Sequence, residues 1–316
     1  MILYENCRRL CEECGKDLDT LLSRAGLSGD TVSRMKTIIP RPQTKTINML
    51  ADIVGVYPIR IIHPEYRIVD GVYTMYNRPI KRYTNKLEVL VANSRLTNQE
   101  FATACGLSVS KVRHPSSALS SAQAERVSRY VGIPMYVILD NNEPLRDGQY
   151  TKQEVDRYTH ENIVYNLRAI YYTSGQKCEP FCRMCDIRSE WFRGVLTKMP
   201  KAIHRVPYLA ENLKLSVKEL TSDYTTSPII HDAFCQMTPL QRMLFMMGLK
   251  GVTPEYIVET FSWPSVEIFS GKPDAMTMEV PYILAQYFQC PNAWFTKDTI
   301  TLEPGQTLRT RWNTVI

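Results

Sequence analysis

An internal repeat of about eighty residues constrains this chain more than any other feature, because a repeat fixes the architecture of the whole chain. The segment from Asp17 to Met35, DLDTLLSRAGLSGDTVSRM, predicts an amphipathic helix, a Gly-Leu-Ser turn and a second short helix. The segment from Thr97 to Val112, TNQEFATACGLSVSKV, has the same order of features. Its Gly106 follows Gly26 by 80 positions. The two segments are therefore interpreted as copies of one helical unit.

The ends of these two copies also correspond. NMLADIVGVYPIRII, from Asn48 to Ile62, parallels AERVSRYVGIPMYVIL, from Ala124 to Leu139. Each predicts an amphipathic helix followed by a glycine, a nearby proline and an apolar run. Gly55 and Gly132 stand where a helix ends in a left-handed residue.

Two fainter copies follow. EPFCRMCDIRSEWFRGVL, from Glu179 to Leu196, places Asp186 at the turn, 80 positions after Gly106. PEYIVETFSWPSVEIFSG, from Pro254 to Gly271, places Ser262 at the turn, 76 positions later. Both copies lack the turn glycine. PYLAENLKLSVKEL and YILAQYFQCPNAWF follow them as the equivalents of the later helices.

One more helical stretch precedes each copy, at Leu3 to Glu13, Lys86 to Asn93, Val164 to Tyr172 and Leu240 to Met247. The segments between copies are neither Gly/Ser-rich nor highly charged, so we expect them to pack or to carry short helices. The predicted fold is all-α, a tandem array of four helical units. The expected domains are residues 1–75, 76–148, 149–230 and 231–316.

The motifs LLSRAGLSGDTVSRM with ADIVGV, and EFATACGLSVSKV with RYVGI, resemble the lambda-repressor-like (Cro-type, XRE-type) helix-turn-helix family. The resemblance covers residues 2–62 and 85–139 well, and residues 163–220 and 240–296 loosely. It implies that the second helix of the turn inserts into the major groove of double-stranded DNA. Basic side chains there read guanine edges, and hydroxyl groups mainly position the helix against phosphate.

The resemblance also implies which side chains face the groove. They are Gly29, Asp30, Thr31, Ser33, Arg34 and Lys36 in the first copy, Val109, Ser110, Lys111, Arg113 and His114 in the second, and Ser189, Glu190, Trp191 and Arg193 in the third. In this family the start of the preceding helix contacts the DNA backbone, which adds Thr97, Asn98 and Gln99. Thr97 and Glu100 have the spacing of a capping box. In the first copy Asp17 and Asp19 occupy the corresponding positions, and two carboxylates oppose a phosphate.

Charge separates the copies further. Counted over the four expected domains, the net charge is +1, +4, +3 and −2, which agrees with the total of +6. If phosphate neutralisation supports affinity, the second and third copies are the better DNA binders. The fourth carries Trp263, Pro264 and Phe269 where polar reading groups are needed. We expect it to serve in packing or in dimerisation.

Other classes of protein find less support. No stretch approaches the roughly 20 apolar residues of a membrane span, and the N-terminus lacks the features of a signal peptide, so the expected location is the cytoplasm. Five scattered histidines, without a metal-protease, nucleophile-elbow or phosphate-loop motif, indicate no enzyme and no cofactor. The spacing Cys7-x3-Cys11-x2-Cys14 recurs at Cys178, Cys182 and Cys185 and matches a cluster-binding spacing of radical enzymes. On a helix the same spacing places sulfurs on one face, where cysteine is a small core residue, so no metal is expected.

The sequence thus predicts a DNA-binding regulator of transcription, of the repressor type, with phage or mobile-element origin a suitable setting. The alternative from another class is a protein-interaction scaffold made of degenerate helix-turn-helix units. Besides DNA, the expected partner is a second copy of the chain or another protein, bound through the C-terminal unit. A third alternative is a redox- or metal-responsive regulator that uses the clustered thiols.

Overall fold

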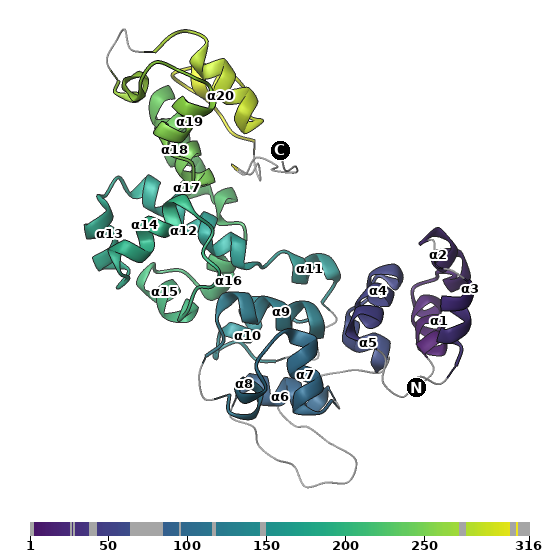
Figure 1. Cartoon of the computed structure of the whole chain (residues 1–316). Helices are drawn as coiled ribbons and strands as arrows, with labels where there is room; N and C mark the ends of the chain where they lie inside the picture. The colour runs from purple at the N-terminus through teal and green to yellow at the C-terminus, as the bar shows by residue number, and fades with distance from the viewer. Residues whose placement is uncertain are drawn as a thin grey trace. The chain divides into compact units, whose positions relative to one another are not determined.

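The computed structural model describes residues 3–25, 27, 29–37, 43–63, 85–94, 96–115, 118–145, 150–271, 276–303 and 308. Every regular element in these ranges is a helix and none is a strand (Figure 1). The all-α class predicted from the sequence is confirmed. The chain divides into two compact units, one formed by Met1–Thr159 with Ala202–Pro207 and the other by His160–Lys201 with Tyr208–Ile316.

The first compact unit contains eleven described helices, most of them two to three turns long. They are α1 (Leu3–Glu13), α2 (Leu18–Arg24), α3 (Gly29–Met35), α4 (Thr44–Val54), α5 (Pro58–Ile62), α6 (Lys86–Asn93), α7 (Asn98–Cys105), α8 (Val109–Arg113), α9 (Ser121–Val131), α10 (Met135–Leu139) and α11 (Lys152–Asp156). In the first copy α1 packs on α4 and α5, and α2 packs on α4. Cys7, Leu10 and Leu50 are fully buried in the core that these helices share.

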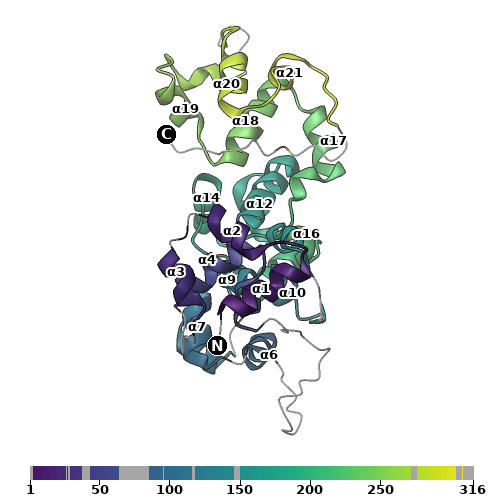
Figure 2. The same cartoon turned by 90° about the vertical axis from the view of Figure 1, so that its right-hand side faces the viewer.

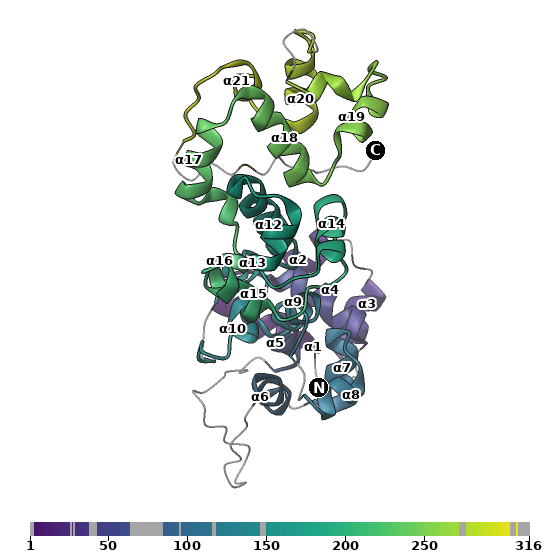
Figure 3. The same ribbon diagram turned by 90° about the vertical axis from the view of Figure 1, so that its left-hand side faces the viewer.

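The described elements of the second compact unit are also helices. They are α12 (His160–Ser174), α13 (Cys178–Met184), α14 (Ser189–Thr197), α15 (Val206–Asn212), α16 (Val217–Thr221), η1 (Tyr224–Thr226), α17 (Pro228–Gln236), α18 (Pro239–Lys250), α19 (Pro254–Thr260), η2 (Val266–Phe269), α20 (Val280–Phe288) and α21 (Ala293–Thr296). Helix α18 packs against α12, α20 and α21 (Figures 2 and 3). The core around it includes Phe234, Phe245 and Phe288.

The backbone repeats at the turn between the second and third helix of each copy. Gly106, Asp186 and Ser262 have φ values of 60°, 51° and 53°, in the left-handed region. Gly26 lies outside the described residues. After each turn residue the next N–H donates to the carbonyl five residues earlier, as a Schellman motif requires; the pairs are Leu27–Leu22, Leu107–Ala102, Ile187–Cys182 and Trp263–Val258. The turn positions predicted at Asp186 and Ser262 are confirmed.

A second left-handed residue ends the fourth helix of each copy. Gly55 and Gly132 take this conformation as predicted, with φ values of 82° and 74°. In the later copies Lys214 and Gln289 adopt it at 57° and 53°. A side chain with a Cβ costs roughly 1–2 kcal/mol in this region. The third and fourth copies therefore keep the backbone turn although they have lost the residue that suits it.

A polar side chain of the first helix closes the last helix in every copy; we call these side chains the first-helix anchors. Each donates to a backbone carbonyl near the end of the short final helix, where no intrahelical partner is available. The pairs are Asn6 with Ile61 at 2.9 Å, Lys86 with Val137 at 2.5 Å, Asn166 with Leu220 at 2.8 Å and Arg242 with Trp294 at 2.5 Å. The donor changes from amide to ammonium to guanidinium, while the bond is retained.

The expected helices ahead of each copy are confirmed as α1, α6, α12 and α18. The connectors were expected to pack or to carry short helices. This is confirmed in their described parts, where α11 and α17 form. The connector from Pro64 to Tyr83 lies outside the described residues. One expected α-helix differs, because η2 is a four-residue 3-10 helix. It follows Pro264, which limits the backbone of the residue before it and delays the helix start.

Candidate nucleic-acid interface

The second copy presents a well-formed start of helix α7. Thr97 caps it, because its hydroxyl accepts from the Glu100 N–H at 3.2 Å and its own N–H donates to the Glu100 carboxylate at 2.9 Å. The predicted capping box is confirmed. Asn98 and Gln99, in the first turn, are exposed. Their backbone N–H groups belong to the end of the helix that carries partial positive charge.

Helix α8 has one buried side and one exposed side. Val112 is buried against the rest of the copy, and Ser108 caps the helix by accepting from the Lys111 N–H at 3.2 Å. Ser110, Arg113 and His114 are exposed. A groove-reading helix requires this geometry: a tight turn, then a helix that packs through a buried apolar residue and exposes its opposite face.

Lys111 is placed differently from its predicted neighbours on α8. It is half-buried, and its ammonium donates to the Ala118 carbonyl at 2.9 Å. Burial lowers its pKa. Part of this side chain therefore stabilises the loop after α8, so a Lys111 substitution would change the local fold as well as the surface charge.

The first copy brings together only some of its predicted residues. Asp30, Ser33, Arg34 and Lys36 are exposed on or just after α3, which Met35 anchors in the core. The backbone of Thr31 lies in α3, and its side chain is outside the described residues. The Lys36 ammonium lies 4.7 Å from the centre of the Tyr4 ring, an arrangement that favours a cation–π contact.

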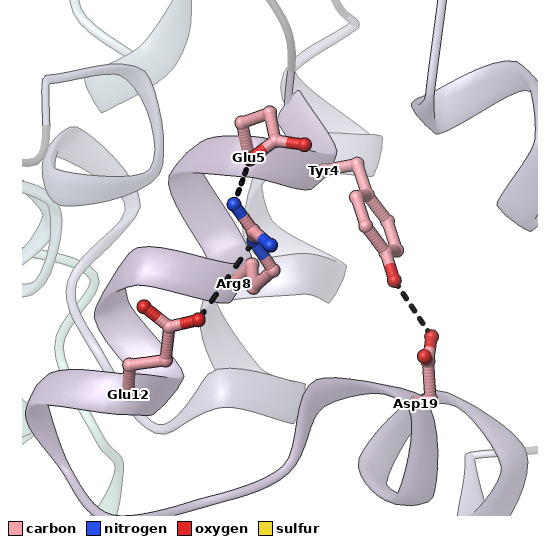
Figure 4. Close-up of polar contacts among 5 residues, drawn as sticks. All are labelled: Tyr4, Glu5, Arg8, Glu12 and Asp19. Carbon is pink, nitrogen blue, oxygen red and sulfur yellow. Dashed lines mark hydrogen bonds and ion pairs between the residues drawn. The ribbon is translucent and has the colours of Figure 1, made fainter.

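The two carboxylates at the start of α2 serve the fold. Asp17 caps the helix, accepting from the N–H and the hydroxyl of Thr20 at 2.8 and 2.6 Å, and these bonds lower its pKa. Asp19 accepts from the Tyr4 hydroxyl at 2.8 Å and so links α2 to α1 (Figure 4). Both acidic groups stand at the start of this helix, where their charges would repel a phosphate.

The outer face of α1 pairs its own charges. Arg8 lies between two carboxylates on the same helix, Glu5 at 2.8 Å and Glu12 at 3.8 Å (Figure 4). Arg60 of α5 pairs with Glu13 at 2.7 Å. Such exposed pairs contribute little to stability. They do leave the α1 face with balanced charge, which a phosphate-binding surface would not have.

In the third copy the helix after the turn, α14, has an exposed face, as α8 has in the second copy. Phe192 and Val195 are buried under α14, and the Phe192 ring packs on Phe181 of α13 with 5.0 Å between centres. Of the predicted contact residues, Ser189 and Trp191 are partly exposed. Arg193 is exposed and lies 3.6 Å from the Glu179 carboxylate.

The structure also shows basic residues that the sequence reasoning missed. They lie at or near the ends of α13 and α14, and all are exposed: Lys177, Arg183, Arg188, Lys198 and Lys201. Lys177 and Arg188 are the N-cap residues that directly precede the two helices. Together with Arg193 they make α13 and α14 the most cationic described pair of helices around a turn. The net charge of +3 in the expected third domain indicated these basic residues as a group, but it did not identify their positions.

Two buried arginines have a structural role. The Arg168 guanidinium donates to the carbonyls of Val195, Lys198 and Leu249 at 2.7, 3.1 and 3.1 Å and thereby closes the ends of α14 and α18. Arg242 is fully buried and bonds to carbonyls around α21. Burial lowers the pKa of both groups. Neither charge is available to a phosphate.

The fourth copy has a different surface. Trp263 stacks on Phe261 with 5.0 Å between ring centres, and Phe269 is buried. Several large apolar side chains are exposed in this copy, namely Tyr256, Val266, Met278 and Tyr282.

The clustered cysteines do not form a metal site in the part of the chain that the structure describes. No group of three or more histidine, cysteine or acidic side chains is arranged there to hold a metal ion. Cys7, Cys11, Cys182 and Cys185 are buried in helical cores, as the spacing predicted, whereas Cys14 is exposed and Cys178 is partly exposed.

Among the described helices, none has the length and apolar character needed to span a membrane.

Comparison with known proteins adds no relative. No protein-family model, no curated protein sequence and no solved structure matches this chain.

Proposed function

We propose that this chain is a sequence-specific DNA-binding protein, built from four tandem helix-turn-helix units at residues 1–75, 76–148, 149–230 and 231–316. Regulation of transcription, of the repressor type and in the cytoplasm, is the role that this proposal implies. The observation that carries it is the pair α7 and α8. A capped first helix, a left-handed Gly106 and an exposed second helix on a buried Val112 stand together in the most basic quarter of the chain.

The exposed side chains of α8 suit a division of labour on double-stranded DNA. Arg113 is long and planar, and it can donate to both acceptors of a guanine edge. Ser110 and the first turn of α7 offer hydroxyl and backbone donors to phosphate. In the third unit Arg193 takes the reading position, and the exposed basic residues at the helix ends supply phosphate contacts.

The units differ in what they contribute. The second and third carry the DNA contacts, because they expose basic residues around their turns. The first contributes less, since Asp17 and Asp19 stand at the start of its α2. Tandem units on one chain raise the effective concentration of each unit near the DNA once another is bound.

The fourth unit supports a second candidate function. Its exposed Tyr256, Met278 and Tyr282 are large apolar side chains, which suit contact with a protein partner or a second copy of the chain better than contact with DNA. If this surface is the main one, the chain is a protein-interaction scaffold of degenerate helix-turn-helix units. The scaffold predicts no affinity for DNA even at low ionic strength.

Binding to random-sequence duplex DNA, measured by fluorescence anisotropy across a salt series, separates the two candidates. For a DNA-binding protein the affinity falls steeply with salt, and Arg188→Ala with Lys201→Ala, which removes two of the proposed phosphate contacts, weakens binding and lowers the slope by roughly 1 for each phosphate that is no longer neutralised. Arg129→Ala is the matched control, because Arg129 is an exposed arginine outside the proposed contacts and pairs with Glu125 on α9. Absence of binding at the lowest salt would exclude the DNA function.

A further inference from the structure

Two cysteines of the third copy lie close enough to react with each other. The sulfurs of Cys178 and Cys182 are 3.8 Å apart on successive turns of α13. Cys178 is the first residue of the helix and is partly exposed, whereas Cys182 is buried. One thiol is thus accessible to a small oxidant from solvent, and the other is positioned to attack the oxidised sulfur.

We propose that Cys178 and Cys182 form a reversible oxidation site, in which a peroxide converts the two thiols to a disulfide across one turn of α13. The Cys178 thiol loses its proton and attacks hydrogen peroxide. The O–O bond breaks, the sulfur becomes a sulfenic acid, and the released hydroxide takes that proton and leaves as water. The Cys182 thiol then loses its proton and attacks the Cys178 sulfur. The S–S bond forms as the S–O bond breaks, and a second water leaves. The two thiols lose two electrons and the peroxide gains them.

The burial of Cys182 assigns the two roles. Burial, with the hydrogen bond to Cys178, raises the pKa of Cys182 to about 12. Cys182 therefore stays protonated and inaccessible until a neighbouring sulfur is oxidised, because the thiolate is the reactive form of cysteine. Its closeness to Cys178 compensates for this low intrinsic reactivity.

Formation of this disulfide requires α13 to change shape. Side chains four apart on a helix have Cβ atoms about 5–6 Å apart, whereas a disulfide brings them to about 3.5–4.5 Å. The two turns must therefore move closer together. A bond formed against such resistance is readily reduced again by thiols, which is the property of a regulatory disulfide.

The change in α13 has a route to α14. Phe181 lies between the two cysteines in sequence and packs on Phe192 and on Tyr171, at 5.0 and 5.2 Å between ring centres. Glu179 follows Cys178 directly and holds Arg193 at 3.6 Å. Oxidation would thus disturb both the packing of Phe192 under α14 and the position of the exposed Arg193.

Tryptic peptide mapping after peroxide treatment tests the site. Cleavage after Lys177 and Arg183 isolates CEPFCR, which holds these two cysteines and no other. The protein carries Cys14→Ser to remove an exposed thiol, and remaining thiols are alkylated before digestion. We expect CEPFCR to be unalkylated, lighter by two hydrogen atoms, and restored by dithiothreitol. Recovery of the peptide alkylated at Cys182, with Cys178 carried on to sulfinic acid, would overturn the proposal.

A chain-internal control and a second variant make the test specific. Cys7 and Cys11 have the same spacing on α1 but are both buried, so they should remain reduced at the same peroxide dose. In Cys182→Ser the Cys178 sulfenic acid should persist and react with dimedone several-fold more than in the parent. Equal dimedone labelling of the two proteins would contradict the role of Cys182.

The effect on DNA rests on the proposed function and is measured separately. Oxidation should weaken DNA binding of the protein several-fold, and Cys178→Ser should make binding insensitive to peroxide. A disulfide without any DNA binding would refute the proposed function and leave the oxidation site standing. DNA binding with no disulfide would do the reverse.

Discussion

The side-chain amide of Asn166 donates a hydrogen bond of 2.8 Å to the carbonyl of Leu220, and so joins the first and last helices of the third copy. The same amide donates to the Ser222 carbonyl at 2.6 Å. Asn166 is fully buried, and its bond to the Leu220 carbonyl is buried as well. Equivalent bonds in the other copies use Asn6, Lys86 and Arg242. The bond is thus a shared feature of the repeat that survives the divergence of its side chains.

Replacing Asn166 should destabilise the second compact unit. Asn166→Leu keeps a similar volume and leaves the buried Leu220 carbonyl without this donor, at a cost of about 1–3 kcal/mol for a missing buried partner. Urea denaturation followed by far-UV circular dichroism measures the change in the free energy of unfolding. Gln176→Leu removes an amide at an exposed position and should change stability by less than about 0.5 kcal/mol. Similar destabilisation of both variants would refute the role of Asn166.

The left-handed positions predict opposite effects in early and late copies. Lys214→Gly relieves a strained backbone and should raise stability by about 0.5–1 kcal/mol, after the entropy cost of glycine is subtracted. Gly132→Ala should lower it, because an added Cβ would clash with the Tyr57 ring and φ is 74°. Thermal melts of both variants give the comparison. A stabilised Gly132→Ala would show that the turn is not held as described.

Stability should fall in mildly alkaline solution. Burial raises the pKa of Cys7 to about 12 from its ordinary value of 9.0. The unfolded chain therefore releases this proton first, and the stabilisation present below pH 9 is lost as the pH rises towards 12. Between pH 8 and pH 10 the loss due to Cys7 is about 1 kcal/mol. Urea midpoints should fall more in the parent than in Cys7→Ala, and an equal fall would contradict this.

Sequence patterns predicted the local architecture well. The expected bounds of α1 and α6 agree with the structure at both ends, because apolar spacing and capping residues are properties of neighbouring positions. The repeat predicts turns at Asp186, 80 positions after Gly106, and at Ser262, 76 positions later, within segments that parallel the first two copies. The repeat thus predicts the turn in copies where the residue type no longer shows it.

The remainder depends on contacts between distant residues. Asn166 and Leu220 are 54 positions apart, and no periodicity connects them. Lys111 was predicted as a contact residue, and its bond to Ala118 depends on how the loop after α8 folds back. Arginine is usually exposed, so the sequence does not predict that Arg168 is buried. Only the packed structure shows that its guanidinium donates to carbonyls at the ends of two helices.

Selection of preferred sequences from randomised duplex DNA tests the central claim most directly, since specificity is what separates a DNA reader from a basic surface. The full chain should enrich one extended motif, and Arg113→Ala should lose the preference at one block of that motif while keeping the rest. Arg129→Ala should select the same motif as the parent. Enrichment of no sequence by the parent chain, under conditions where it binds DNA, would contradict sequence-specific recognition.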